Sequence, residues 1–199
     1  MVAVVIGLQL ALPDSLSSQY AYVWCGVEAA LLVVVTGLNP RRISAHDQVT
    51  RRASLALVVV MSVANLSNVI LLVRQLLGGG VDNATALLLS GGSIWITNVV
   101  VYALWYWEFD RGGPGARAEA KYHVPDFMFP QMSDPDLSAP HWAPSFFDYL
   151  YMSFTNSSAF SPTDVLPLTR WAKALMMAQS ATSLTVVALV IARAVNILR

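Results

Sequence analysis

Four long apolar segments constrain the fold of this chain more than any other feature of its sequence. They are Tyr20–Leu38, Ala53–Leu77, Ala84–Trp107 and Arg170–Ile197. Each approaches or exceeds the roughly 20 apolar residues that an α-helix needs to cross a bilayer. Because lipid offers the backbone no hydrogen bonds, such segments must be helical. The sequence therefore predicts an all-α fold, a polytopic transmembrane helical bundle of four to five spans that forms a single domain over residues 1–199.

Composition and charge agree with a membrane protein and exclude several other classes. Apolar residues make up 56% of the chain and charged residues 12%, about half the charged share of a soluble domain. The formal net charge is zero, so no basic excess points to nucleic acid. Cys25 is the single cysteine, which excludes an internal disulfide and a multi-cysteine metal site. We expect the lipid bilayer as a partner, and no nucleic acid, cofactor or metal.

The first apolar stretch, residues 1–12, is too short to cross a membrane. A helix of this length rises about 18 Å, whereas the hydrocarbon is about 30 Å thick. The stretch lacks a basic start and a small-residue cleavage site, which disfavours a signal peptide. We expect a short helix here, either a truncated first helix or a tilted half-span.

Positive charge gathers in two of the connections between the apolar segments. The residues are Arg41, Arg42, Arg51 and Arg52 in the first connection, and Arg111, Arg117 and Lys121 in the second. Because short cytoplasmic loops are enriched in Arg and Lys, we expect both connections on the cytoplasmic side. The second belongs to a long extramembrane loop over residues 108–144, rich in Pro and Gly. The aromatic run Trp105–Trp107 before it is typical of an interfacial belt.

Glu28 is an unusual residue because its charge lies inside an apolar segment. It lies about 12 Å into that segment, where an ionisable side chain is costly and is commonly functional. Arg74 lies near the end of the next, antiparallel segment, at a comparable depth. The sequence therefore allows an intramembrane charge pair between Glu28 and Arg74. In the alternative, Arg74 extends to the lipid headgroups and Glu28 is protonated or bonded to an asparagine amide.

The sequence carries no motif of a soluble enzyme. It contains no H-E-x-x-H, no G-x-S-x-G and no phosphate-binding glycine loop. The His and Asp residues of the 108–144 loop lack the regular spacing of a metal site. We therefore expect no enzyme activity and no catalytic residues.

The stretch "FFDYLYMSFTNSSAFSPTDVLPLT", residues 146–169, is too polar and too interrupted to be an ordinary span. Ser145 followed by Asp148 is a capping-box pattern, which predicts the start of a helix. Small polar residues and a proline end that helix early, so its length suits a short re-entrant, pore-helix-like segment over residues 146–158. A short true span over residues 146–160 is the competing topology.

Polar side chains of this segment and of the last apolar segment are the candidate site. Polar groups at membrane depth must either line water or hydrogen-bond a neighbouring helix. The pore or constriction candidates are Ser153, Thr155, Asn156, Ser157, Ser158, Asp164, Gln179, Thr182 and Ser183. On the last segment they recur at three- and four-residue spacing, which places them on one helix face.

The order of elements in residues 95–197 resembles that of the pore-loop cation channels. A helix, a long loop and a short helix precede the tail Asp164-x-x-Pro167-x-Thr169, which matches the D-x-x-P-x-T of those channels. The resemblance implies a pore surrounded by several copies of the chain. The residues "NSSAFSP" stand where a potassium filter has glycines, so potassium selectivity is not implied. The charge rule places the pore loop on the cytoplasmic side, as in glutamate-receptor pores.

A second resemblance covers most of the chain. The phrases "ALWYWEFDRGGPGARA", "PDFMFPQM" and "DYLYMSFTNSSAFSPTD" are similar to those of a family of bacterial integral membrane proteins with a domain of unknown function. This resemblance implies a multi-pass protein of the bacterial inner (cytoplasmic) membrane. It implies no activity.

Three functions remain open on the sequence. The first is a channel-like homo-oligomer that passes small ions along the re-entrant segment and the last helix. The second is a structural or partner-binding membrane protein without transport. The third is a small proton-coupled transporter that uses Glu28. An oligomer with the polar segment on its axis favours the first function, and dry packing of that segment disfavours it.

Overall fold

The computed structural model describes residues 1–10, 21–38, 48–78, 83–119, 124–134, 136, 139, 142–158 and 163–197. The long elements are α1 (Val2–Leu10), α2 (Ala21–Leu38), α3 (Gln48–Leu77), α4 (Ala84–Phe109), α7 (Phe146–Ser158) and α8 (Arg170–Ile197). The short elements are η1 (Asp110–Gly112), α5 (Pro114–Ala118), β1 (Phe127–Met128), α6 (Pro130–Ser133) and β2 (Leu166–Pro167). The chain is mostly helical, which confirms the predicted all-α class at this level.

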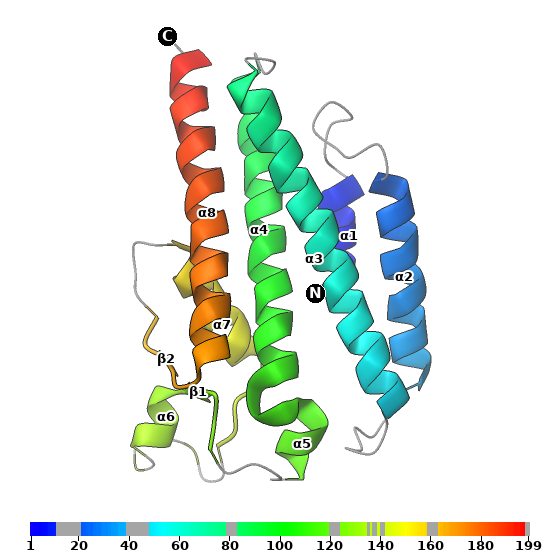
Figure 1. Ribbon diagram of the computed structural model, residues 1–199, viewed down its shortest axis with the longest axis vertical. Helices are drawn as coiled ribbons and strands as arrows, with labels where there is room; N and C mark the ends of the chain where they lie inside the picture. The colour runs from blue at the N-terminus through cyan, green and yellow to red at the C-terminus, as the bar shows by residue number, and fades with distance from the viewer. Residues whose placement is uncertain are drawn as a thin grey trace.

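Three helices of the described chain are long and apolar enough to cross a membrane: α3, α4 and α8. They pack on one another, with α1 and α2 on one flank of the bundle (Figure 1). The predicted segment Tyr20–Leu38 does form a helix, α2, but it is a shorter apolar helix than the other three. The short first helix is also present, as α1, and it lies against α2 and α4.

Three apolar clusters hold the helices together. The first joins α3, α4 and α8 and contains Val69, Leu72, Leu87, Ile94, Val186, Val190 and Ala194. The second joins α4, α7, α8 and the strand pair, and contains Tyr106, Phe127, Phe129, Tyr149, Met152, Val165, Ala172 and Met176. The third joins α1, α3 and α4 and contains Val2, Val5, Leu57, Met61, Val100 and Val101. The aromatic second cluster fixes the end of the bundle at which α7 begins.

The end of α4 is a sharp turn that redirects the chain across this end of the bundle. Arg111, Gly112 and Gly113 all have positive φ, of 49°, 78° and 100°. A Cβ atom at Gly113 would lie 2.9 Å from the carbonyl oxygen of Glu108, so glycine is required there. Pro114 then starts α5, where its missing N–H costs nothing.

Helix α7 lies between α4 and α8 but covers only part of their length. Its first residue, Phe146, packs on Trp107 near the end of α4. Its thirteen residues rise about 20 Å, and Ser157 in its last turn meets Ser183 in the middle of α8. The chain then comes back to β2, which pairs antiparallel with β1 at the end where α7 began (Figure 1).

Helices α4 and α8 cross closely at Gly91. This predicts that alanine substitutions at two adjacent glycines differ in their effect on stability. A Cβ at Gly91 would lie 2.7 Å from a methyl group of Val190, whereas a Cβ at Gly92 meets nothing within 4 Å. We expect Gly91→Ala to destabilise the fold by about 1–3 kcal/mol through overpacking. Gly92→Ala is the matched control and should be neutral or stabilising, because alanine favours a helix. Unfolding in detergent followed by circular dichroism measures both, and equal effects would contradict the close crossing.

Candidate functional site

Gln179, on α8, is the centre of a buried hydrogen-bond network that joins α4, α7 and α8. Its side chain is fully buried. Its Nε2 donates to the Ser153 hydroxyl at 2.6 Å, to the Ser153 carbonyl oxygen at 3.0 Å and to the Ser157 hydroxyl at 2.7 Å. Its Oε1 accepts from the Tyr106 hydroxyl at 2.5 Å and from Asn156 Nδ2 at 2.8 Å. One amide therefore holds the polar face of α7 and the end of α4 together.

Hydroxyl groups of α8 also donate hydrogen bonds to carbonyl oxygens in the last turn of α7. The final carbonyls of a helix have no partner within the helix and need another donor. The Ser180 hydroxyl donates to the Asn156 carbonyl oxygen at 3.1 Å, and the Ser183 hydroxyl donates to that of Ser157 at 2.6 Å. Trp95, on α4, donates to the Ser183 hydroxyl at 2.6 Å. Two carbonyl groups in the last turn of α7 therefore have hydrogen-bond donors from α8, near the middle of the bundle.

The structure brings most of the predicted constriction residues together, but inside one chain. The buried ones are Ser153, Thr155, Ser157, Gln179 and Ser183. Asn156, Ser158 and Thr182 are partly buried, and Asp164 is exposed. The hydroxyls of Thr155 and Thr182 donate to carbonyls of their own helices. Most of the set therefore packs within the chain, and Asp164 is its only exposed member.

The outward face of α7 is aromatic. Phe147 is 70% exposed, and Tyr151 and Phe154 are each 50% exposed. These positions recur at three- and four-residue spacing, so they form one stripe opposite the polar face. The face of α7 that points away from its own chain is therefore suited to lipid or to an apolar protein surface.

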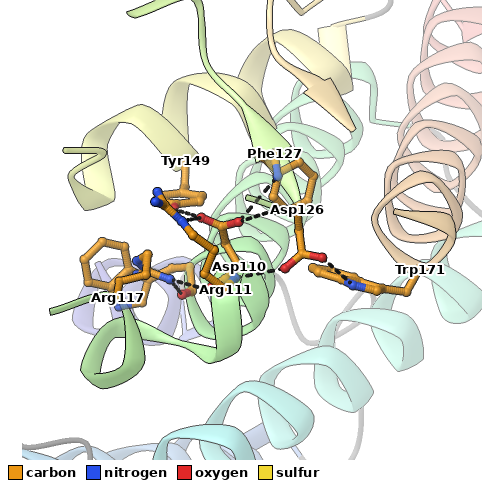
Figure 2. Close-up of polar contacts among 8 residues, drawn as sticks. Asp110, Arg111, Arg117, Asp126, Phe127, Tyr149 and Trp171 are labelled. Atoms are coloured by element: carbon orange, nitrogen blue, oxygen red, sulfur yellow. Dashed lines mark hydrogen bonds and ion pairs between the residues drawn. The ribbon is translucent and has the colours of Figure 1, made fainter. Parts of the chain in front are cut away.

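Asp110 forms a second polar cluster, at the end of the bundle (Figure 2). Its carboxylate is fully buried and accepts from the Tyr149 hydroxyl at 2.6 Å and from the backbone N–H groups of Asp126 and Phe127 at 2.9 and 3.4 Å. Arg111 Nε completes it with an ion pair at 3.4 Å. One carboxylate therefore joins the end of α4 to α7 and to β1.

Asp126 extends this cluster to α8. Its carboxylate accepts from the backbone N–H of Arg111 at 2.9 Å and from Trp171 Nε1 at 3.0 Å (Figure 2). The sequence predicted only a long extramembrane loop over residues 108–144. Within it, Asp110 and Asp126 are structural acceptors, because the turn after α4 folds this part of the loop back against the helices.

Arg117 caps the end of α4 from α5. Its Nη1 donates to the carbonyl oxygens of Trp107 and Asp110 at 2.6 and 2.8 Å. Its guanidinium lies 4.2 Å from the ring centre of Trp107 and 5.2 Å from that of Tyr149, which is cation–π geometry. Burial lowers the pKa of Arg117, and the charge of Asp110 opposes this shift. A cation at the carboxyl end of a helix is also favourable to the helix dipole.

The predicted pair of Glu28 and Arg74 is not formed. Glu28 is fully buried and accepts a hydrogen bond from Gln9 Nε2 at 3.1 Å, whereas Arg74 is exposed in the last turn of α3. The reason is the path of α3, which leaves α2 and crosses to α4 and α8 at its carboxyl end (Figure 1). Helix α1 covers Glu28 instead. A glutamine amide therefore takes the role that the sequence suggested for an asparagine.

Several members of these clusters were not identified from sequence. Tyr106 was placed in an interfacial belt, yet it is fully buried and bonded to Gln179. Gln9 did carry a signal, since it is the one polar side chain in the apolar helix α1. Asp110 and Asp126 had no such signal in the sequence, because most of their partners come from segments distant in sequence.

The described positive residues of the two predicted cytoplasmic connections lie at the same end of the bundle. Arg51 and Arg52 are in the first turns of α3, and Arg111 and Arg117 follow α4 at the same end (Figure 1). The Arg51 side chain lies 3.9 Å from the position of a Cβ at Gly113. Arg41, Arg42 and Lys121 lie outside the described residues. The start of α8 adds Arg170 and Lys173 to this basic end.

Comparison with known proteins assigns no relative to this chain. No protein-family model matches it, and neither the curated proteins nor the solved structures contain a significant match.

Proposed function

We propose that this chain is a polytopic integral membrane protein that assembles into a channel-like homo-oligomer and passes small ions. Membrane embedding is supported by the outward faces of the long helices. On α3, the exposed apolar residues Val59, Val63, Leu66 and Ile70 recur at three- and four-residue spacing. On α8, the corresponding stripe contains Met177, Leu184, Ile191 and Val195. Such stripes on two of the three long apolar helices are suited to lipid.

The basic end of the bundle is proposed to face the cytoplasm. It carries Arg51, Arg52, Arg111, Arg117, Arg170 and Lys173, whereas Arg74 and Arg193 lie toward the other end. The rule that cytoplasmic loops are positive then gives this orientation. Together with the resemblance to bacterial integral membrane proteins, this orientation favours the bacterial inner membrane. Labelling of a cysteine at Asp134, in a Cys25→Ser chain, by an impermeant maleimide outside intact cells would contradict the orientation.

The observation that carries the proposal is the placement of α7 between α4 and α8. Its start and the strand β2 that follows it lie at the basic end, while its last turn reaches the middle of α8. In a membrane, a helix placed in this way is a re-entrant half-span. Its negative carboxyl end is directed to mid-depth, as in helices that stabilise cations. A helix pair that holds such a half-span matches the order of elements in pore-loop channels.

The structure changes which residues are proposed for the path. Gln179, Ser153, Ser157 and Ser183 are engaged in hydrogen bonds, so we assign them to hold α7 at its depth. The Ser158 hydroxyl donates to the Thr155 carbonyl oxygen of its own helix at 3.0 Å. Asp164, exposed before β2, is therefore the main candidate left for contact with water and ions. An acidic ring of Asp164 from several copies would favour cations.

A second candidate function is a membrane protein that packs or binds a partner without transport. The observation that favours it is the closed network around Gln179, since its members bond to one another within one chain. In this function the polar face of α7 serves only to fix the helix. Ion flux separates the two candidates.

The test is flux of sodium, potassium, protons and chloride through purified protein in liposomes. We expect cation flux above that of empty liposomes and a several-fold loss of it in Asp164→Asn, because the acidic ring loses its charge. Asp136→Asn is the matched control, since Asp136 is also an exposed acid but lies in the loop between α4 and α7. Its flux should equal that of the unmodified chain.

Two outcomes contradict the proposal in different ways. If no ion crosses at any voltage or pH, the second candidate replaces the channel. If both acid variants lose flux equally, ions pass but Asp164 has no special place on the path.

A further inference from the structure

Glu28 occupies a buried position between α1 and α2, outside the proposed ion path. Of the described side chains of α2, only Cys25 and Glu28 are buried, and those facing away are largely apolar. Helix α1 covers them with Gln9, which is 4% exposed. An acid therefore stands where an apolar residue would pack α1 on α2 at lower cost.

The hydrogen bonds around Glu28 satisfy one of its oxygens and leave the other without a partner. Gln9 Nε2 donates to Glu28 Oε1 at 3.1 Å, and the Cys25 thiol donates to Gln9 Oε1 at 3.4 Å. The thiol therefore orients the amide so that its NH₂ faces the acid. Glu28 Oε2 is buried and has no hydrogen-bond partner.

No positive charge in the described residues compensates an ionised Glu28. Helix α1 has no ionisable side chain, and besides Glu28 itself α2 contributes only the Cys25 thiol and the phenol of Tyr22, which is exposed. On α3, the cations Arg51, Arg52 and Arg74 are exposed and lie near the two ends of the helix. A carboxylate with one neutral donor and no cation is strongly disfavoured at membrane depth, whereas the neutral acid is tolerated.

We infer that Glu28 is a proton-binding site within the membrane domain. Oε2 carries the proton, Oε1 is the carbonyl oxygen that accepts from Gln9, and Gln9 is the positioning residue. The ligand is a proton from water, and binding converts the carboxylate to the neutral acid with no other reactant. Release of the proton would require water at Oε2, which separation of the short helix α1 from α2 would admit. This site is independent of the ion path at α7.

Infrared spectroscopy of the full chain in lipid tests this inference. At neutral pH we expect a carboxylic acid C=O band that is absent in Glu28→Gln, a variant that keeps the acceptor for Gln9. We also expect the band to shift to lower frequency after transfer to D₂O, because a binding site exchanges its proton. Glu119→Gln is the matched control. Glu119 is exposed and lies outside the long helices, so its replacement should leave this band unchanged.

The role of Gln9 has its own spectral signature. Gln9→Leu removes the hydrogen bond to the carbonyl oxygen, so the band should move to higher frequency and remain present. A purely structural Gln9 would leave the frequency unchanged.

Two results would overturn the site itself. One is a spectrum in which unmodified protein and Glu28→Gln do not differ at neutral pH. The other is a band that never shifts in D₂O. If Glu28→Gln fails to fold, labelling of the unmodified chain with dicyclohexylcarbodiimide, which reacts with protonated acids in lipid, replaces the variant. Mass spectrometry should find the adduct on Glu28, and its absence there would count against the site.

Discussion

Replacement of Gln179 by leucine is expected to lower the free energy of unfolding by about 3 kcal/mol. The change keeps the size of the side chain but removes five hydrogen bonds between α8 and its neighbours. Hydrogen bonds between membrane helices are worth about 0.6 kcal/mol each on average, which gives the expected loss. Denaturant titration in detergent micelles, followed by circular dichroism, measures it.

Two further variants distinguish the loss of the Gln179 hydrogen-bond network from the general effect of removing a polar group. Thr182→Val removes a hydroxyl that bonds only within α8, at Ala178, so we expect a loss well under 1 kcal/mol. Tyr106→Phe should destabilise the normal chain but restore part of the stability of Gln179→Leu, because it removes the hydroxyl donor that this change leaves without its acceptor. Additive losses in the double variant would mean that Tyr106 and Gln179 are not coupled.

Local signals in the sequence were sufficient to predict where the helices near the site begin and end. The predicted helix over residues 146–158 coincides with α7, and the Ser145 N–H donates to the Asp148 carboxylate, as one half of the capping box requires. The Ser145 hydroxyl donates to the same carboxylate instead of accepting from the Asp148 N–H, which bonds to the Ser145 carbonyl oxygen. The bounds 170–197 coincide with α8. By contrast, α3 begins at Gln48, before the predicted Ala53, because a helix can continue past the apolar segment through polar residues such as Arg51.

The partners of the polar residues could not be predicted, because they depend on packing. Hydropathy marked Gln179 and Asn156 as polar at depth but could not distinguish a dry network from a water path. The pair of Glu28 and Arg74 was inferred from depth alone, and depth does not show which way a helix leans. The left-handed residue Arg111, with φ of 49°, brings Asp110 and Asp126 together, and no hydropathy pattern encodes such a turn.

Replacement of Asp110 by alanine is expected to have the largest effect, a loss of about 3–5 kcal/mol. The change leaves the Tyr149 hydroxyl and the N–H groups of Asp126 and Phe127 without their acceptor. Hydrogen bonds to a charged group are worth about 1.5–3 kcal/mol each, and water that reaches the freed backbone groups offsets part of their sum. The same denaturant titration measures the loss, and Asp136→Ala, at an exposed acid, should be within about 0.5 kcal/mol of the normal chain.

Loss of Asp110 should also release the segment that follows α4, which gives a second measurement. Without this carboxylate, Arg111 and β1 are held chiefly by Asp126 and the strand pair, so trypsin should cleave at Arg111 or Arg117 faster than in the normal chain. Asp110→Asn keeps one carbonyl acceptor for the backbone N–H groups but loses the charge that attracts Arg111, so an intermediate rate is expected. If Asp110→Ala is cleaved no faster than Asp136→Ala, the aromatic cluster alone holds this end of the bundle, and the carboxylate is not needed to seat α7 between α4 and α8.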